Sequence, residues 1–448
     1  QCIINTNYNE VIELLSSFSL GTIVGFFALC LLFVIYIIKL KPCNKIKINF
    51  LIIFLCLVFS LLLRFSTSSY RVLYKENPIL KIYPVVYNTI CNNIKYRFAN
   101  IDIKDIIQEN NTNDLIVVLF VGESARSDHF GLNGYTRNTT PLLSNQKNIV
   151  NFNNAHSHRT STLLSTACIF TGHNDIEKNW LSPGKGTVLG YFKSMGFNLS
   201  VLSTGANDTF NNIKYDASSA NIKMEFNSFA NNFDKITDKK LLDFLKVCLN
   251  KNTGNHFITV LSLGSHYKYD KRTPDEFKKY NKLDDILFEN NIKPKGLYCD
   301  IVYNKKSYNQ IIDEYDYSIM YTDYIINNTI ELLKNKNAVL IYTSDHGESF
   351  GEKNQGCLHA FYDKNAPELF NVPFIVWYSD LYKKQNSSKI DNLIKNMNKA
   401  NNKEIFVSHN NIFHTLLDSA NGKSDAIIKN LSLFSDDISI NKFTDFDR

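Results

Sequence analysis

Five short apolar runs, separated by longer helix-like stretches, constrain the fold of this 448-residue chain more than any other feature. Each run is uncharged and too short for a helix of ordinary length. Strands that are apolar along their whole length are typical of mostly parallel sheets covered by helices on both faces, which predicts an α/β fold. The runs are 115–121, 199–203, 257–263, 338–344 and 373–378, with helices expected at 238–249 and 310–335.

Polar residues follow three of these runs at the point where each strand is expected to end. Glu123 follows the first run, His266 the third, and Asp345 and His346 the fourth. Ligands of open parallel sheets bind beyond the carboxyl ends of the strands. Taken singly, a polar residue after a strand has an alternative interpretation as a helix N-cap. Together, an oxygen-rich set with imidazole is typical of a catalytic zinc site.

A hydroxyl-rich segment, SHRTSTLLSTACIFTG at 157–172, supplies candidate nucleophiles. A hydroxyl at a helix N-terminus lies where backbone N–H groups favour a bound phosphate. A nearby metal ion would lower the hydroxyl pKa and activate it for attack. The alternative is that these residues are caps and helix-surface residues. Spacing does not distinguish among the five candidates, which are Thr160, Ser161, Thr162, Ser165 and Thr166.

His359 lies thirteen residues beyond His346, in the sequence GCLHA. We expect it on a loop that returns to the same edge of the sheet. A single histidine of this kind is commonly incidental, but beside the other ligands it is a candidate for a second metal or for a substrate phosphate.

Two apolar segments near the start predict membrane-spanning helices at 18–38 and 48–63. The alternative for the second is a buried helix of a soluble domain. The loop between them carries four lysines and no acidic residue, which places it in the cytoplasm and the later residues outside. We therefore expect a membrane region at 1–66, amphipathic connecting helices and a linker at 67–112, and a large domain at 113–448 that lies in a periplasm or outside the cell, with an insertion at 268–309.

The net charge bears on possible nucleic-acid partners, and the cysteines bear on possible disulfides. The net charge of +6 is modest and the lysines are dispersed, so no nucleic-acid partner is indicated. An extracytoplasmic domain favours disulfides, but no CxxC pair occurs and the pairing stays open. The candidates are Cys2, Cys91, Cys168, Cys248, Cys299 and Cys357.

Four motifs in order carry a resemblance to a known family: VGESARSDHFGLNGYTRNTTP (121–141), TSTLLSTACIF (160–170), GSH (264–266) and SDHGESFGE…LHA (344–360). With them the sequence resembles the membrane-bound phosphoethanolamine transferases of Gram-negative bacteria, within the alkaline phosphatase and sulfatase superfamily. The resemblance implies an alkaline-phosphatase-like α/β/α sandwich with a mostly parallel sheet, preceded by transmembrane helices. It also implies that residues 1–66 end a longer membrane domain and that residues 113–448 form a periplasmic catalytic domain of the sulfatase type.

The resemblance also implies roles for six residues and a zinc cofactor of one or two ions. Four positions match the zinc ligands of that family, one of which is also the nucleophile that becomes phosphoethanolaminated. Two histidines match positions that bind the substrate phosphate or a second zinc. The implied zinc ligands are Glu123, Thr162, Asp345 and His346, the nucleophile is Thr162, and the two histidines are His266 and His359.

The implied reaction transfers phosphoethanolamine from phosphatidylethanolamine to lipid A or core sugars of lipopolysaccharide or lipooligosaccharide. The resemblance places the protein in the bacterial inner membrane as a monomer, with its catalytic domain in the periplasm, and connects it with resistance to cationic antimicrobial peptides. Two alternatives stay open: a phosphoglycerol transferase acting on a periplasmic glycan, and a catalytically inactive, membrane-tethered sensor or scaffold.

The sequence departs from the phosphoethanolamine transferases at two places, and from the classical sulfatases at a third. His158 stands where family members often have a cysteine that pairs with the residue matching Cys168, so that bridge is not expected here. STGANDTFNNIK (203–214) replaces the usual Asn-Gln-Ser-Gly-Cys-Lys stretch and resembles phosphoglycerol transferases, which leaves Asn207 and Lys214 as weak candidates for substrate contacts. The cysteine of a sulfatase site, in a Cys-x-Pro-x-Arg setting, is absent, which argues against sulfate ester hydrolysis.

Overall fold

The computed structural model describes residues 106–109, 114–172, 186–204, 221–225, 237–251, 253–286, 297–304, 306–352, 356–359 and 366–438. The predicted spans at 18–38 and 48–63, most of the segment 67–112, and Asn207 and Lys214 lie outside these residues. Among the described helices, none combines the length and apolar character that a membrane crossing requires.

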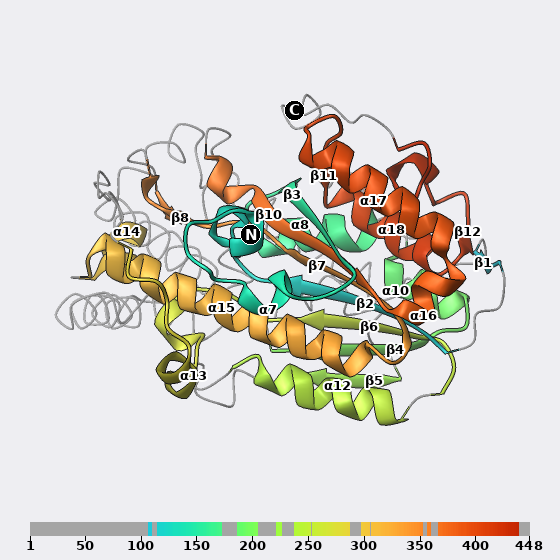
Figure 1. The fold of residues 1–448 in the computed structure, drawn as a ribbon, viewed down its shortest axis with the longest axis horizontal. Coiled ribbons are helices and arrows are strands. Elements are labelled where there is room, and N and C mark those ends of the chain that lie inside the picture. Colours follow the sequence, from blue (N-terminus) through green and yellow to red (C-terminus); the bar gives the residue numbers. More distant parts are fainter. Residues whose placement is uncertain are drawn as a thin grey trace, which may run out of the picture.

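The fold is an alkaline-phosphatase-like α/β fold built on an eight-stranded sheet in the order β11-β3-β10-β7-β2-β6-β4-β5 (Figure 1). The strands pair in parallel except β10, which is antiparallel to both β3 and β7. The predicted mostly parallel sheet is confirmed, and all five apolar runs form strands. The strands are β2 (Leu115–Gly122), β3 (Ile149–His156), β4 (Asn198–Ser203), β5 (Ile222–Glu225), β6 (His256–Leu261), β7 (Asn337–Ser344), β10 (Asn371–Tyr378) and β11 (Val407–Ser408).

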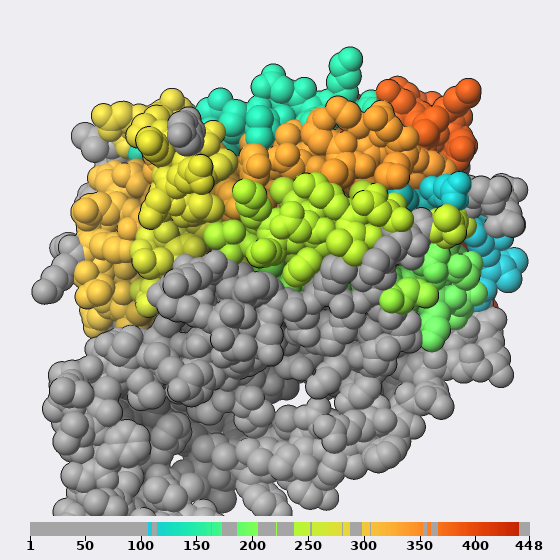
Figure 2. All heavy atoms as spheres, turned by 90° about the horizontal axis from the view of Figure 1, so that it is seen from below, coloured from blue at the N-terminus to red at the C-terminus, as the bar shows by residue number. Residues whose placement is uncertain are grey.

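Helices cover both faces of the sheet, as continuously apolar strands require. Helices α8, α10, α16, α17 and α18 pack on one face, and α7, α12, α13, α14 and α15 on the other. Figure 2 shows α12 and α15 side by side on the second face. The bounds are α7 (Pro141–Ser144), α8 (Thr162–Thr171), α10 (Val188–Ser194), α12 (Lys239–Lys251), α13 (Asp275–Tyr280), α14 (Leu297–Tyr303), α15 (Tyr308–Leu333), α16 (Asp380–Gln385), α17 (Ser387–Asn401) and α18 (Asn410–Ser419).

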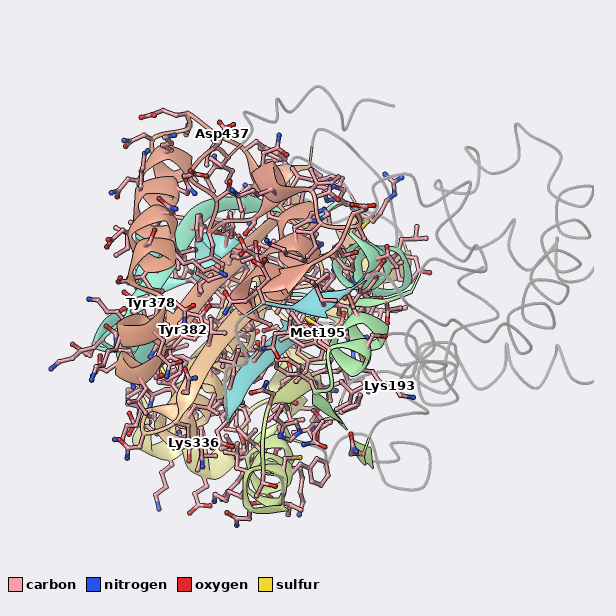
Figure 3. The ribbon with its side chains drawn as sticks, turned by 90° about the vertical axis from the view of Figure 1, so that its right-hand side faces the viewer. Lys193, Met195, Lys336, Tyr378, Tyr382 and Asp437 are labelled. Atoms are coloured by element: carbon pink, nitrogen blue, oxygen red, sulfur yellow. A yellow bond between two sulfur atoms is a disulfide. The ribbon has the colours of Figure 1, made fainter. Side chains whose placement is uncertain are left out.

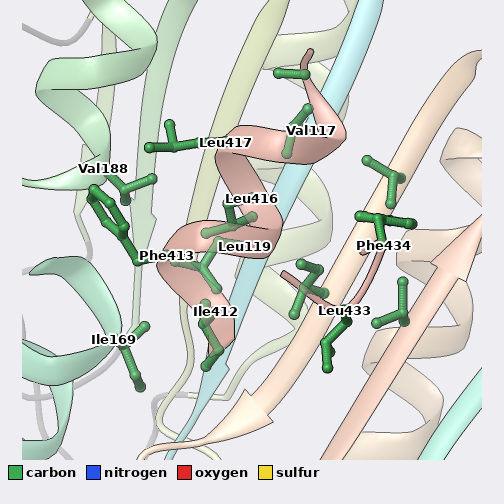
Figure 4. Packing of buried hydrophobic residues seen from close by; sticks show 14 of the residues in the cluster. Val117, Leu119, Ile169, Val188, Ile412, Phe413, Leu416, Leu417, Leu433 and Phe434 are labelled. Carbon is green, nitrogen blue, oxygen red and sulfur yellow. The ribbon is translucent and has the colours of Figure 1, made fainter. Parts of the chain in front are cut away.

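Strand β2 divides its side chains between two apolar cores. Val117 and Leu119 face α18, where they pack near Ile412 and Leu416 (Figure 4). The intervening residues, such as Val118, belong to the core beneath α15. Each fully buried aliphatic side chain contributes about 1.5–3 kcal/mol relative to an exposed one, so both faces stabilise the strand.

The helix ends have local causes in the sequence. Ser307 and Gln310 form a capping box that starts the 26-residue helix α15. The Ser379 side chain accepts a hydrogen bond from Tyr382 N and starts α16. Tyr382, labelled in Figure 3, is buried. Its hydroxyl donates to Ser419 O at the end of α18, which joins two helices of one layer. The predicted helices at 238–249 and 310–335 correspond to α12 and α15.

Sequence reasoning missed β3. This strand carries three asparagines, and because its buried and partly exposed residues alternate it gives no continuous apolar run. Within the segment expected to connect the membrane region to the large domain, β1 (Ile107–Gln108) pairs antiparallel with β12 (Gly422–Lys423). Within 268–309 the described residues contain α13 and α14 and no strand, in keeping with an insertion.

Candidate metal centre

Three neighbouring strands, β6, β2 and β7, bring the predicted polar residues to one edge of the sheet. Glu123 lies one residue past β2, and Asp345 and His346 directly follow β7. His266 lies five residues past β6. Since these strands are adjacent and parallel, their carboxyl ends meet, which is the arrangement that the sequence predicted.

Two backbone features hold the segment that bears Glu123. Ser124 adopts a left-handed conformation with φ of 56°, which turns the chain sharply after the strand. Gly264 approaches the same segment so closely that an added Cβ would lie 2.7 Å from Glu123 N. Only glycine fits there, so the loops after β2 and β6 pack against each other through their backbones.

Glu123, Thr162 and His346 form a tight cluster at this edge. The Thr162 hydroxyl lies 3.1 and 3.2 Å from the two carboxylate oxygens of Glu123 and 3.3 Å from His346 Nε2. His346 Nε2 in turn lies 3.3 Å from Glu123 Oε1 and 3.2 Å from Asp345 Oδ2. Four potential ligand groups therefore converge on one small volume.

Hydrogen bonds orient the two residues after β7. His346 Nδ1 donates to Gly347 O at 2.7 Å, which leaves Nε2 as the nitrogen that faces Glu123. Asp345 Oδ1 accepts from Ser124 N at 3.0 Å and from His346 N at 2.8 Å. Asp345 Oδ2 is buried and lies 3.2 Å from His346 Nε2. A buried carboxylate oxygen beside an imidazole nitrogen is the environment of a metal ligand.

Thr162 is distinguished from the other hydroxyl residues of its segment by its contacts. It is the first residue of α8, and Ser161 is the N-cap. Ser165 and Thr166 instead donate to the backbone carbonyls of Arg159 and Thr162. The structure thus brings Thr162, at a helix N-terminus, to the carboxylate of Glu123, a choice that spacing alone left open.

His266 and His359 lie beside this cluster, and we call them the outer histidine pair. Their ring centroids are 6.3 Å apart, and the ring of His359 lies 4.0 Å from that of His346. His359 Nδ1 lies 3.2 Å from Glu348 Oε2, a buried carboxylate that fixes the ring. Among the described residues the His359 ring is hydrogen-bonded through Nδ1, which leaves Nε2 as the nitrogen that would meet a metal or a phosphate.

The donor groups fit a divalent cation. Ligand atoms of Glu123, His346 and His359 lie within 4.8 Å of one another. Burial disfavours the charged forms, but hydrogen bonding and charge between Glu123 and His346 lower the pKa of Glu123 to about 2. Despite its burial, the neighbouring carboxylates of Asp345 and Glu123 raise the pKa of His346 to about 10. A proton on His346 thus balances buried negative charge that a metal ion would otherwise neutralise.

Sequence reasoning assigned no role to several residues that support the site. Glu348 lies inside the quoted motif SDHGESFGE, and its position four residues past β7 was the available signal. The Tyr315 hydroxyl donates to Ser124 O at 2.7 Å and accepts from Arg126 N at 2.9 Å. Tyr315 comes from α15, and nothing local in the sequence connects it with the loop after β2.

The cysteines resolve two open points. Cys299 and Cys357 form a disulfide that the sequence did not predict. Cys168 is a buried thiol, in agreement with the expectation that the bridge to position 158 is absent.

With the geometry established, comparisons define the class of protein. The family model named Sulfatase matches residues 116–422, more than half of the chain. The chain therefore belongs to the sulfatase family. This match spans the strand ends that carry Glu123, His266, Asp345 and His346.

Particular relatives within that family agree with the resemblance seen in the sequence. The Kdo(2)-lipid A phosphoethanolamine 7''-transferase of Escherichia coli K12 is 32% identical over 282 residues, which cover 61% of this chain and 46% of that protein. The chain thus spans about half the length of this curated relative. The soluble domain of lipooligosaccharide phosphoethanolamine transferase A from Neisseria meningitidis is 26% identical with a TM-score of 0.61, covering 74% of this chain and 96% of that one.

A longer structure from the same organism extends the similarity in fold. The integral membrane protein lipooligosaccharide phosphoethanolamine transferase A from Neisseria meningitidis has a TM-score of 0.67 at 22% identity. The similarity covers 96% of this chain and 80% of that protein. The predicted resemblance to phosphoethanolamine transferases is confirmed at the level of fold and relatives.

Proposed function

We propose that this protein transfers phosphoethanolamine from phosphatidylethanolamine to lipid A or to core sugars of lipopolysaccharide, through a covalent intermediate on Thr162. The observation that carries the proposal is the convergence of Thr162 Oγ1 on Glu123 and His346 at 3.1–3.3 Å. The names of the relatives support the reaction and the acceptor.

Thr162 acts as the nucleophile toward the donor phosphorus. The bond between Thr162 Oγ1 and phosphorus forms as the bond between phosphorus and the diacylglycerol oxygen breaks. The proton of the hydroxyl ends on the departing diacylglycerol oxygen, carried by a histidine of the outer pair. The N-terminus of α8 favours the negative charge of the phosphoryl group.

The second half of the reaction reverses these roles. A hydroxyl or phosphate oxygen of the acceptor attacks the phosphorus, and the bond to Thr162 Oγ1 breaks. The proton that the attacking acceptor group loses passes to Thr162 Oγ1, and the product is the acceptor that carries phosphoethanolamine. The outer histidine pair holds the phosphoryl oxygens through both steps, since charge stabilisation and positioning supply most of the rate in phosphoryl transfer.

Glu123, Thr162, Asp345 and His346 would hold one zinc ion, and the outer histidine pair could help to hold a second. Zinc bound there would lower the pKa of the Thr162 hydroxyl and offset the charge of the two carboxylates. The two buried carboxylates of Glu123 and Asp345, which share one imidazole, and the mixed oxygen and imidazole donor set support this assignment. The location that goes with the reaction is the inner membrane, with a monomeric catalytic domain in the periplasm.

Labelled donors test the reaction. The full chain in detergent is incubated with phosphatidylethanolamine labelled in its headgroup, and the intact protein is then examined by mass spectrometry. We expect wild-type protein to gain the mass of one phosphoethanolamine at Thr162 and Thr162→Ala to gain none. An active enzyme that never carries the adduct would refute the covalent route.

The same assay separates the alternatives. Phosphatidylglycerol labelled in its headgroup replaces the first donor, and label transferred from it alone would establish a phosphoglycerol transferase. A protein that binds zinc but transfers neither label would establish a sensor or scaffold.

A further inference from the structure

A disulfide joins helix α14 covalently to the segment that carries His359. Cys299 of α14 and Cys357 form a disulfide with a Cα–Cα distance of 4.9 Å across 58 residues of sequence. Cys357 begins the two-residue strand β9 (Cys357–Leu358), which pairs antiparallel with β8 (Ser349–Phe350). His359 is the residue that follows β9. The disulfide therefore fixes the backbone two residues before a site histidine.

The backbone between the disulfide and His359 is held in an unfavourable conformation. Leu358 has a φ of 65°, in the left-handed region that a branched side chain seldom adopts. Such a conformation persists where the surroundings impose it. Here the disulfide constrains one side of Leu358, and the contact between His359 and Glu348 constrains the other.

The same helix also contacts the segment that carries His266. The Tyr267 hydroxyl donates to Ile301 O in α14 at 3.0 Å. The Tyr303 hydroxyl, at the end of α14, donates to Phe350 O in β8 at 2.8 Å. Three links therefore start from α14. One reaches the segment of His266, one reaches the segment of His359, and one reaches β8, the strand that pairs with β9.

The two histidine segments are not joined by a strand ladder. His266 N donates to Leu263 O within its own turn, and β9 pairs with β8. Across the described residues, no backbone hydrogen bond connects 264–268 with 356–359. The separation of the two rings, 6.3 Å, therefore depends on elements that contact both segments. The strand ends do so on the inner side, through Ser265 N to Glu123 O and through the ring of His346, and α14 does so as a second element.

We propose that α14, through its disulfide and its two tyrosine hydrogen bonds, is the positioning element that sets the spacing of His266 and His359 for the donor phosphate. This inference rests on the proposed function and adds residues that touch neither metal nor phosphate. The inner cluster of Glu123, Asp345 and His346 stands on strand ends and does not depend on α14. Loss of the links should therefore weaken phosphate binding and leave the inner metal in place.

The main test compares variants of α14 in the full chain. Cys299→Ala with Cys357→Ala removes the disulfide without adding an unpartnered hydroxyl. Tyr303→Phe and Tyr267→Phe keep the disulfide and each remove one hydrogen bond to or from α14. They therefore test the role of α14 even if the double cysteine variant folds poorly. Cys248→Ala, a buried cysteine on α12 outside the site, is the matched control for the loss of a sulfur.

We expect the KM for labelled phosphatidylethanolamine to rise about tenfold in the double cysteine variant and less in each tyrosine variant, with zinc content unchanged. Cys248→Ala should match wild type. A melting temperature that falls while KM and kcat stay at wild-type values would make the disulfide a stabilising crosslink only and overturn the proposal. Equal losses of kcat and zinc would overturn it too, because they would place the effect in the inner cluster.

Inorganic phosphate separates failure of this inference from failure of the proposed function. Its affinity is measured by calorimetry on the zinc-loaded proteins, without a lipid donor. A tenfold weaker affinity in the double variant supports positioning by α14 even if no lipid donor is ever turned over. Equal affinity in wild type and variant, or no phosphate binding by wild type, overturns it.

Discussion

The inner cluster and the outer histidine pair lie side by side but are built in different ways. Glu123, Asp345 and His346 follow the ends of adjacent central strands, so the sheet itself fixes their spacing. His266 and His359 lie on loops, and their spacing depends on a short helix, a disulfide and the carboxylate of Glu348. A rigid sheet edge suits a metal whose ligands must not move. Loops beside it suit a substrate that must enter and leave.

This difference predicts a hierarchy of mutational effects. Changes in the inner cluster should abolish chemistry or metal binding. Changes around the outer pair should weaken substrate binding. Changes to residues that support the loop after β2 should lower the free energy of unfolding before they affect activity. A mutation whose measured effect belongs to a different level would break this order.

The largest effect is expected at Thr162, the proposed nucleophile. Thr162→Ala removes the only atom that can form the covalent bond in the proposed mechanism, so transfer should fall by at least about 10⁴-fold. Headgroup transfer from labelled phosphatidylethanolamine measures it. Thr171→Ala is the matched control, since Thr171 is on the same helix and its hydroxyl donates to Ala167 O. A Thr162→Ala protein with more than a tenth of wild-type activity would show that another residue attacks.

The next effect is expected in metal content. Glu123→Gln removes one negative charge and one anionic ligand while keeping the shape of the side chain. We expect zinc affinity to fall more than about 100-fold, since loss of an outer partner alone typically costs 10–100-fold. Competition with a chelator measures it, and circular dichroism shows that the fold persists. Asp323→Asn, which alters a buried carboxylate that accepts from Leu142 N and Leu143 N, should leave zinc affinity unchanged.

The inner cluster should also show steep proton linkage. The pKa of His346 is raised to about 10 by Asp345 and Glu123 in spite of burial, so without metal the imidazole carries a proton at neutral pH. Burial and the charge of Glu123 raise the pKa of Asp345 to about 7. Metal binding must displace these protons, and zinc affinity should therefore rise with pH.

The slope gives the number of protons displaced. Affinity should rise about tenfold per pH unit between pH 7 and 10, where one proton leaves, and more steeply below pH 7, where Asp345 also loses one. Titration in zinc-buffered solutions at pH 5.5–8.5 measures the slope. An affinity that does not change with pH would mean that His346 is neutral before metal binds.

The inner cluster was accessible to sequence reasoning because its signals are local. A polar residue directly after an apolar strand can be read from the chain, and parallel strands bring such residues together. The supporting residues carry no comparable signal. Tyr315 acts across 191 positions, and the Cys299–Cys357 pair was one of many possible pairings. Strand β3 was missed because its asparagines interrupt the apolar run, although tertiary packing still makes it a strand.

An intermediate effect is expected at Glu348, the partner of His359. Glu348→Gln keeps the size of the side chain but removes the charge that orients the imidazole. We expect donor KM to rise about 10–100-fold with zinc content near wild type, as for loss of a carboxylate behind a ligand histidine. Glu352→Gln is the control on the same loop, because Glu352 pairs with Arg126 rather than with a histidine. Loss of zinc in Glu348→Gln would place His359 in the inner cluster.

The smallest effect on activity is expected at Tyr315, which supports the loop after β2. Tyr315→Phe leaves Ser124 O and Arg126 N without their hydrogen-bond partner in a buried setting. The cost to the free energy of unfolding should be about 1–3 kcal/mol, the penalty for unsatisfied buried polar groups. Chemical denaturation measures it, with Tyr303→Phe as a comparison whose hydroxyl bonds to β8 instead. Because the central strands still fix Glu123 and His346, zinc affinity should change less than in Glu348→Gln or Glu123→Gln. A loss of zinc as large as that of Glu123→Gln would mean that α15, rather than the sheet edge, sets the geometry of the metal site.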